Sequence, residues 1–143
     1  MSELAGYSGT PLAQKLGLKD GQRVLFIDLP ASLAELATAR DFVETSRRTV
    51  GELDDAATGY DVIHLFTTAR ATLEALGQRL MELIARNGMI WVSWPKKAAK
   101  IATDITEDVV RAVLLPLGLV DVKVCAVDAT WSGLKMMIRK ELR

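Results

Sequence analysis

The amino-acid sequence predicts a three-layer α/β fold, in which an open, mostly parallel sheet of six strands carries helices on both faces. Continuous apolar runs, typical of strands buried on both faces, alternate with stretches of helical periodicity. The last two strand segments are joined by too few residues for a crossover helix, so they must be antiparallel. With right-handed crossovers, the predicted strand order is 2-1-3-4-6-5.

The chain of 143 residues is expected to form a single domain, residues 1–143. Residues 1–20 are expected to be a helical segment that caps the sheet, in which Thr10 and Pro11 open a short helix. Residues 23–28 are a continuous apolar run and predict the first buried strand.

The next stretch is predicted to complete a strand–turn–helix unit. Ser32 with Glu35 three residues later is the pattern of a capping box, and it predicts a helix to about residue 38. Residues 42–45 are a weaker strand candidate. Residues 47–59 carry no clear periodicity and are interpreted as a loop with one helical turn.

The central part of the chain predicts two further buried strands with a helix between them. Residues 60–66 and 89–94 are the strands, and an apolar stripe between them predicts a helix capped by Thr67 or Thr68. Asn87 and Gly88 are the expected end of that helix.

The carboxyl-terminal part predicts one helix and a β-hairpin. Asp104 and Glu107 form a second capping-box pattern, which predicts a helix that ends before Pro116. Residues 120–127 and 134–140 are the two strands of the hairpin.

Composition excludes several classes of protein. Half of the residues are hydrophobic and a quarter charged, which is usual for a globular domain, and 18 basic residues balance 18 acidic ones. Zero formal charge argues against a protein devoted to binding nucleic acid or an anionic membrane. No apolar run reaches the length of a membrane span, so no membrane association is expected and the protein is expected to be cytoplasmic.

A parallel sheet that ends in an antiparallel hairpin resembles the class I S-adenosylmethionine-dependent methyltransferases, whose Rossmann-like fold places its last strand antiparallel between neighbours. The resemblance is topological and covers about residues 23–140. It implies a glycine-rich turn after the first strand and an acidic residue at the end of the second, both of which contact the cofactor.

The cofactor turn departs from that pattern. The first strand is followed by Asp28 and Pro30, and no glycine occurs between Gly21 and Gly51. Glycine lets a backbone approach a ligand closely, and proline has no amide to donate. Asp28 and Glu44 are therefore the candidate cofactor-binding residues, with Glu44 either replacing the ribose-binding carboxylate or simply solvated, and no cofactor is assigned.

Shorter strings resemble a family of small bacterial proteins known only as a domain of unknown function. These strings are YSGTPL (7–12), WVSWPKK (91–97), TDITE (103–107), LPLGLVDVKVC (115–125) and WSGLK (131–135). This resemblance covers nearly the whole chain. It implies a methyltransferase-like fold and no established activity.

Ligands of open α/β sheets bind outside the carboxyl ends of the parallel strands, and this rule selects the candidate ligand-binding residues. Lys96 and Lys97 follow the strand that Pro95 ends and are candidates for holding a phosphate or carboxylate together with the amides that open the next helix. The alternative, which the zero net charge of the protein favours, is a solvated basic loop. The complete candidate set is Tyr7, Thr10, Trp94, Lys96, Lys97, Asp104 and Trp131.

Each of the other candidates also has a simpler explanation. Asp104 is accounted for by its capping box, and Trp94 and Trp131, which are candidates for stacking on a planar ligand, by core packing. Trp91 and Trp94 have opposite parity in their strand, so they are expected to point to different sides of it.

Residues that often carry catalysis are interpreted here as structural. His64, the only histidine, is in the middle of a buried strand and is expected to be a neutral imidazole bonded to a neighbour. Cys125, the only cysteine, is interpreted as an unreactive thiol that packs in the core. One histidine and one cysteine on different strands predict no metal site.

Three functional hypotheses remain open. The preferred one is a degenerate methyltransferase-like module that binds a small anionic ligand at the strand ends. The alternatives are an interaction or regulatory protein, in which a homodimer forms through the edge hairpin and its open strand near Met136–Arg139, and an active methyltransferase with an unusual cofactor turn. The missing glycines place the active enzyme last.

Overall fold

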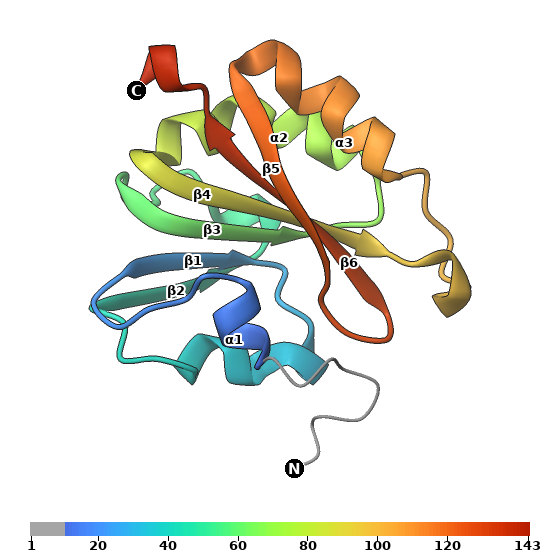
Figure 1. Cartoon of the computed structure of the whole chain (residues 1–143), viewed down its shortest axis with the longest axis horizontal. Coiled ribbons are helices and arrows are strands. Elements are labelled where there is room, and N and C mark those ends of the chain that lie inside the picture. Colours follow the sequence, from blue (N-terminus) through green and yellow to red (C-terminus); the bar gives the residue numbers. More distant parts are fainter. Residues whose placement is uncertain (1–10) are drawn as a thin grey trace.

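The computed structural model of the chain describes residues 11–143. Its six-stranded sheet has the order β2-β1-β3-β4-β6-β5, which confirms the predicted order. Strands β1 to β4 are parallel, and β6 runs antiparallel between β4 and β5 (Figure 1). The strands are β1 (Arg23–Ile27), β2 (Glu44–Arg48), β3 (Tyr60–Phe66), β4 (Ile84–Pro95), β5 (Leu119–Ala126) and β6 (Trp131–Ile138).

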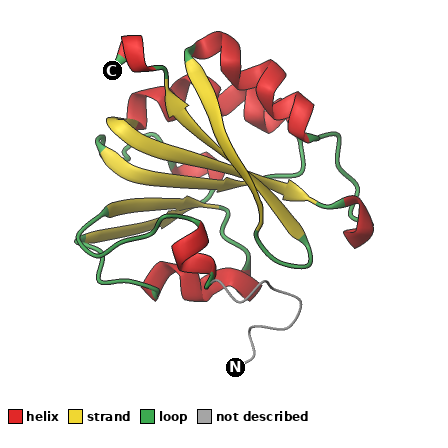
Figure 2. Ribbon diagram, viewed as in Figure 1, coloured by secondary structure: helices red, strands yellow, loops and turns green. Residues whose placement is uncertain are grey.

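Two helices cover one face of the sheet, as Figure 2 shows. They are α2 (Arg70–Leu83) and α3 (Glu107–Leu114), and α3 continues into the 3₁₀ turn η5 (Leu115–Leu117). Their apolar residues pack on alternate residues of the strands in one buried cluster. Gly77 lets α2 approach η5 closely, because a Cβ there would lie 2.6 Å from the Leu117 side chain.

Short helices from the amino-terminal part of the chain cover the opposite face of the sheet. They are α1 (Leu12–Lys15) and the 3₁₀ helix η2 (Ala31–Thr38), which pack with the other set of strand residues in a second cluster. Trp91 belongs to this cluster, whereas Trp94 belongs to the first, so the two rings lie on opposite faces as their parity predicts. Both are buried.

Several predicted boundaries in the first half are wrong. Residues 31–38 form a 3₁₀ helix after Pro30, and no Ser32 side chain caps it. The second strand begins at Glu44 rather than at residue 42 and continues to Arg48. After it, η3 (Val50–Glu52) is the predicted single helical turn, and here a capping box does occur, between Thr49 and Glu52.

The boundary between α2 and β4 also differs from the prediction. The helix ends at Leu83, and the strand begins at once with Ile84, which pairs with Tyr60. Gly88 therefore lies in a strand and is no helix stop. A Cβ at Gly88 would lie 2.8 Å from the carbonyl oxygen of Tyr60, so glycine permits this close approach.

The hairpin is placed as predicted, but β6 occupies residues 131–138 rather than 134–140. Because β6 lies between β4 and β5, the segment near Met136 is not an open edge, and the exposed edge is β5. Val122 has no partner in β6, since Asp121 pairs with Met136 and Lys123 with Lys135, so β5 contains a bulge. In the part of the chain that the structure describes, no helix is long and apolar enough to cross a membrane.

Candidate functional site

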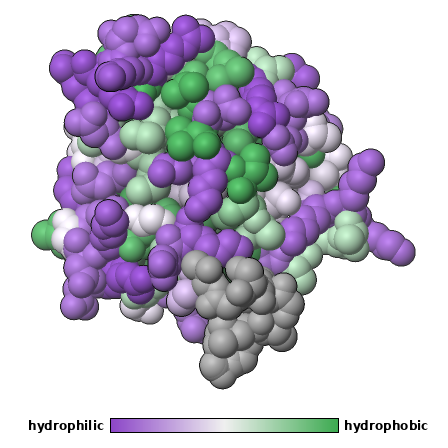
Figure 3. Space-filling view, in the orientation of Figure 1, coloured by the Kyte–Doolittle hydropathy of each residue, from purple (hydrophilic) through white to green (hydrophobic). Residues whose placement is uncertain are grey.

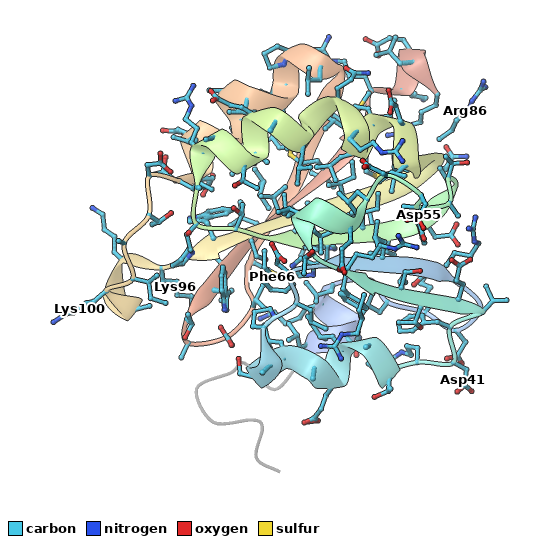
Figure 4. All side chains as sticks on the ribbon, turned by 180° about the vertical axis from the view of Figure 1, so that it is seen from behind. Asp41, Asp55, Phe66, Arg86, Lys96 and Lys100 are labelled. Atoms are coloured by element: carbon cyan, nitrogen blue, oxygen red, sulfur yellow. The ribbon has the colours of Figure 1, made fainter. Side chains whose placement is uncertain are left out.

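The carboxyl ends of β3 and β4 and the start of β6 meet at one edge of the sheet. Pro95 pairs with Trp131, and the amide of Lys96 donates a hydrogen bond to the carbonyl oxygen of Thr130 at 2.8 Å. The hairpin tip is thereby held against the end of β4, so the structure brings Lys96 and Trp131 together, as predicted. Figure 4 shows Lys96 and Phe66 at this edge, on the same side of the molecule.

Trp131 is supported by contacts from both sides. Its ring meets the ring of Phe66 edge-on, with centroids 5.3 Å apart. Its amide donates to the carboxylate of Asp128 at 2.7 Å, which closes the tight turn before β6. Trp131 and Lys96 are half-buried, and Lys97 is exposed at the start of η4 (Lys97–Ala99). The edge thus combines one fixed aromatic ring with two lysines.

Trp94 and Asp104 do not join this group as free ligand-binding side chains. Trp94 is 7% exposed and packs in the core cluster beneath α2 and α3. The helix that Asp104 was expected to cap begins with Thr106, whose hydroxyl accepts the amide of Val109. The carboxylate of Asp104 instead accepts the amide of Arg70, at 2.7 Å, and so caps α2.

Tyr7 and Thr10 lie outside the described residues. Their expected position over the strand ends therefore stays a prediction.

The turn after β1 is bound to the end of the neighbouring strand β2. Asp28 has a left-handed backbone conformation, with φ of 57°, and its amide donates to the carbonyl oxygen of Arg48 at 2.8 Å. Partial burial raises the pKa of the Asp28 carboxyl, against the opposing hydrogen bond from the amide of Val50. The amide of Asp28 thus continues the pairing of β1 with β2.

Glu44 lies at the wrong end of its strand for a cofactor-binding residue. It is the first residue of β2, because the strand begins two residues later than predicted, and it forms an ion pair with Arg23 at 2.8 Å. The hydrogen bond from Arg23 is the main reason that the pKa of Glu44 is lowered. Glu44 joins β2 to β1 at the amino ends of these strands, away from the carboxyl ends where the candidate ligand-binding residues lie.

The end of β2 carries an arginine in place of the expected carboxylate. The guanidinium of Arg48 donates to Asp55 at 2.5 Å and to the carbonyl oxygen of Glu52 at 2.8 Å. It borders a depression of about 550 Å³ beside β2. Its lining is polar: Ser46, Arg47, Arg48, Gly51, Glu52, Asp54 and Asp55. Residues 47–59 show no clear periodicity in the sequence, so nothing there predicted this site.

The remaining reactive side chains are structural. His64 lies 1% exposed in β3, with Nε2 2.7 Å from Oγ of Ser93, which agrees with the predicted neutral imidazole. Burial raises the pKa of the Cys125 thiol. Among residues 11–143, no group of three or more His, Cys, Asp and Glu side chains is arranged to hold a metal ion.

Known structures share this architecture. A SAM-dependent methyltransferase from Aquifex aeolicus matches with a TM-score of 0.67 and 16% identity, over 96% of this chain and 93% of that chain. The chain has the class I methyltransferase-like fold. A TehB-like SAM-dependent methyltransferase from Corynebacterium glutamicum matches with a TM-score of 0.57 and 12% identity, over 96% and 92% of the two chains.

Fibrillarin from Aeropyrum pernix, whose structure contains natively bound S-adenosyl-L-methionine, shares the fold with a TM-score of 0.52 and 12% identity, over 88% of this chain and 73% of that chain. No model of a protein family matches the sequence, and no curated protein matches it either. The resemblance to short bacterial proteins of unknown function stays a prediction.

Proposed function

We propose that this chain is a ligand-binding module that has the methyltransferase-like fold but does not transfer methyl groups. Its ligand carries an anionic group that binds beside Lys96 and Lys97, against the ring of Trp131. The observation that carries the proposal is the backbone hydrogen bond between Lys96 and Thr130, because it fixes a residue with a cationic side chain next to the start of β6, where Trp131 lies, at the carboxyl ends of the parallel strands.

The turn after β1 argues against S-adenosylmethionine as the ligand. The amide of Asp28 is bonded to Arg48, Pro30 has no amide, and the end of β2 offers a guanidinium where the resembling enzymes have a carboxylate. Each hydrogen bond lost to a charged or polar ligand group weakens binding by about 1 to 3 kcal/mol, so losing two lowers affinity by roughly thirtyfold or more.

The anion is bound by the lysines rather than by the start of α3. Thr106 already accepts an amide of the first turn, and Glu107 and Asp108 place two negative charges there. Like charges repel an anion, so the amides of α3, which the sequence suggested as part of the site, contribute little. The binding energy then comes from Lys96, Lys97 and the face of Trp131.

Calorimetry with S-adenosylmethionine tests the first part of the proposal. We expect no binding at micromolar concentrations. A dissociation constant in the low micromolar range would contradict it and would favour the alternative of an active methyltransferase.

Thermal shift measurements test the anion site. Phosphate-bearing and carboxylate-bearing metabolites are screened against the unmodified protein, and any hit is repeated with the double variant Lys96→Ala, Lys97→Ala. We expect the stabilisation by the hit to disappear, while the unliganded melting temperature changes by only a few degrees.

The matched control, Lys19→Ala with Arg86→Ala, removes two exposed charges elsewhere, and Figure 4 shows Arg86 at the opposite side from Lys96. A screen with no hit, or equal loss in the control, would overturn the site.

A homodimer formed through β5 is the second candidate function. Val120, Val122 and Val124 are 37%, 50% and 45% exposed on this edge strand, and Figure 3 shows hydrophobic residues along this part of the surface. The bulge at Val122 and the charge of Lys123 oppose pairing of the edge. Analytical ultracentrifugation of the protein at micromolar concentration tests this candidate, because a monomeric sedimentation coefficient would exclude the homodimer.

A further inference from the structure

The segment that joins β4 to α3, residues 96–106, lies across the turn between β3 and α2, and we call it the strap. Asp104 accepts the amide of Arg70 at 2.7 Å, although the two residues are 34 positions apart. The hydroxyl of Thr103 donates to the carbonyl oxygen of Thr68, also at 2.7 Å. Two adjacent strap residues thus bind the two sides of one turn.

Beneath these contacts, the strap inserts one apolar residue into the core. Ile105 is 2% exposed and belongs to the same buried cluster as Trp94, which is 7% exposed. Trp94 is the next-to-last residue of β4, at the ligand-binding edge of the sheet. The strap and the end of the strand that Lys96 follows therefore each contribute a residue to the same buried cluster.

The rest of the strap is weakly held. Lys97, Ile101, Thr103 and Asp104 are exposed, with Ile101 43% exposed, so the strap buries little apolar surface besides Ile105. Lys100 has a left-handed conformation, with φ of 56°, which is unfavourable for a residue with a side chain. The hydrogen bonds that Thr103 and Asp104 make to the turn before α2 are exposed to water, which competes for them. Segments of this kind open at lower free energy than the core.

We propose that the strap is a lid, held shut by Asp104 and Thr103, whose opening withdraws Ile105 and uncovers Trp94 beside Lys96. The kind of ligand that an open lid admits rests on the proposed function, but the proposal that the lid opens does not. Trp94, which the sequence marks as a ring for ligand stacking, is then available only in the open state.

Asp104 determines the strength of the closure, because it also caps α2. The N-cap residue of α2, Ala69, has no side chain that accepts a hydrogen bond, so the carboxylate of Asp104 supplies the cap from outside the helix. A carboxylate at a helix start is favoured by the helix dipole. Removing a side-chain cap typically shifts such an equilibrium about fivefold, so Asp104→Ala should raise the open population by about that factor.

Hydrogen–deuterium exchange on the full chain, without ligand, tests the lid. In Asp104→Ala we expect the amide of Ile105, which donates to Thr103 in the closed strap, to exchange about fivefold faster, and the amide of Arg70, which loses its acceptor, to exchange at least as much faster. The amide of Lys96, which is bonded to Thr130, and those of β1 and β3 should be unchanged. The control is Asp54→Ala, which removes an exposed carboxylate that makes no hydrogen bond or ion pair with a described residue and should change no strap amide. Unchanged strap exchange, or faster exchange of the whole sheet, would overturn the proposal.

Two further variants keep the test decisive if Asp104→Ala does not fold. Asp104→Asn retains an oxygen that accepts the Arg70 amide but loses the charge, so the strap should exchange at an intermediate rate. Thr103→Val removes the bond to Thr68 and also the bond that the Thr103 hydroxyl accepts from the amide of Ile105, so it should accelerate exchange at Ile105 and, through opening of the strap, at Arg70. A Trp131→Phe background leaves two tryptophans, Trp94 and Trp91, and Trp91 is 0% exposed in the cluster on the opposite face, so it should add only a constant signal. Acrylamide quenching in this background should increase with exchange across the series, and quenching that stays constant would contradict the uncovering of Trp94.

Discussion

His64 Nε2 and Ser93 Oγ lie 2.7 Å apart where β3 pairs with β4, and both side chains are buried. The imidazole also stacks on the ring of Phe66, with centroids 4.1 Å apart. Burial lowers the pKa of His64 from its usual value near 6.5 to about 3. The histidine is therefore neutral in the folded protein at any pH above that value.

This buried histidine should make the protein less stable in mild acid. The unfolded chain binds a proton at His64 near pH 6.5, whereas the folded chain does not until about pH 3. The free energy of unfolding should therefore fall as pH drops below 6.5, by up to about 1.4 kcal/mol per pH unit, and this loss is absent above pH 6.5. Urea unfolding at a series of pH values measures the slope.

The comparison is with His64→Asn, which retains a polar group near Ser93 but does not titrate. Between pH 6 and 4.5 its stability should depend less on pH than that of the unmodified protein. Carboxyl groups contribute equally to both proteins, so they cancel in the difference. Equal slopes would show that His64 becomes protonated without unfolding.

Gly88→Ala should destabilise the sheet. An added Cβ would lie 2.8 Å from the carbonyl oxygen of Tyr60 and from the Ile84 side chain, so the strands β3 and β4 must move apart. We expect a loss of about 1 to 3 kcal/mol, measured by urea unfolding. Gly51→Ala is the control, because nothing lies within 4 Å of its added Cβ, and it should be neutral to about 0.5 kcal/mol. Equal effects at both positions would show that the crowding at Gly88 is relieved at no cost.

Trp131→Ala should separate stacking from charge at the proposed anion site. If Trp131 stacks on the ligand, the variant should weaken the binding of adenosine monophosphate by roughly tenfold or more and leave inorganic phosphate nearly unaffected. Trp131→Phe retains a ring beside Phe66 and should restore most of the affinity. Titration calorimetry measures both probes, and equal weakening of the two would remove stacking from the site.

Deleting Val122 should make β5 prone to self-association. The deletion removes the bulge, so that Asp121 and Lys123 become consecutive partners of Met136 and Lys135 in a regular edge strand. A regular apolar edge pairs with other chains more readily than a bulged one. Light scattering after size exclusion should show a larger mass than for Val122→Ser, which keeps the bulge. Equal masses would mean that the bulge does not protect the edge.

The sheet order was predictable from the sequence because it depends on local pattern and connection length. Apolar runs at residues 23–28, 60–66 and 89–94 mark buried strands wherever they are placed in space. The four residues between β5 and β6 forbid a crossover. The neutral state of His64 follows from the same reasoning, since any residue in the middle of such a strand is buried.

The boundaries and the site depended on partners from distant parts of the chain. Ile84 is in a strand because Tyr60 pairs with it, and nothing near Asn87 in the sequence reveals that pairing. Glu44 begins its strand, and Arg23 on the neighbouring strand binds it there. Because β2 begins two residues later than predicted, this carboxylate lies at the amino end of the strand instead of near its carboxyl end.

Asp104 shows most directly what only the tertiary structure decided. The sequence supplies an acidic residue three positions before Glu107, which is the local pattern of a capping box and correctly predicts a helix nearby. In the folded chain the carboxylate binds the amide of Arg70 instead, while Thr106 caps α3. Local pattern identifies a residue able to cap a helix, but which helix it caps depends on where the crossover connections place the strap relative to the ends of β3 and β4.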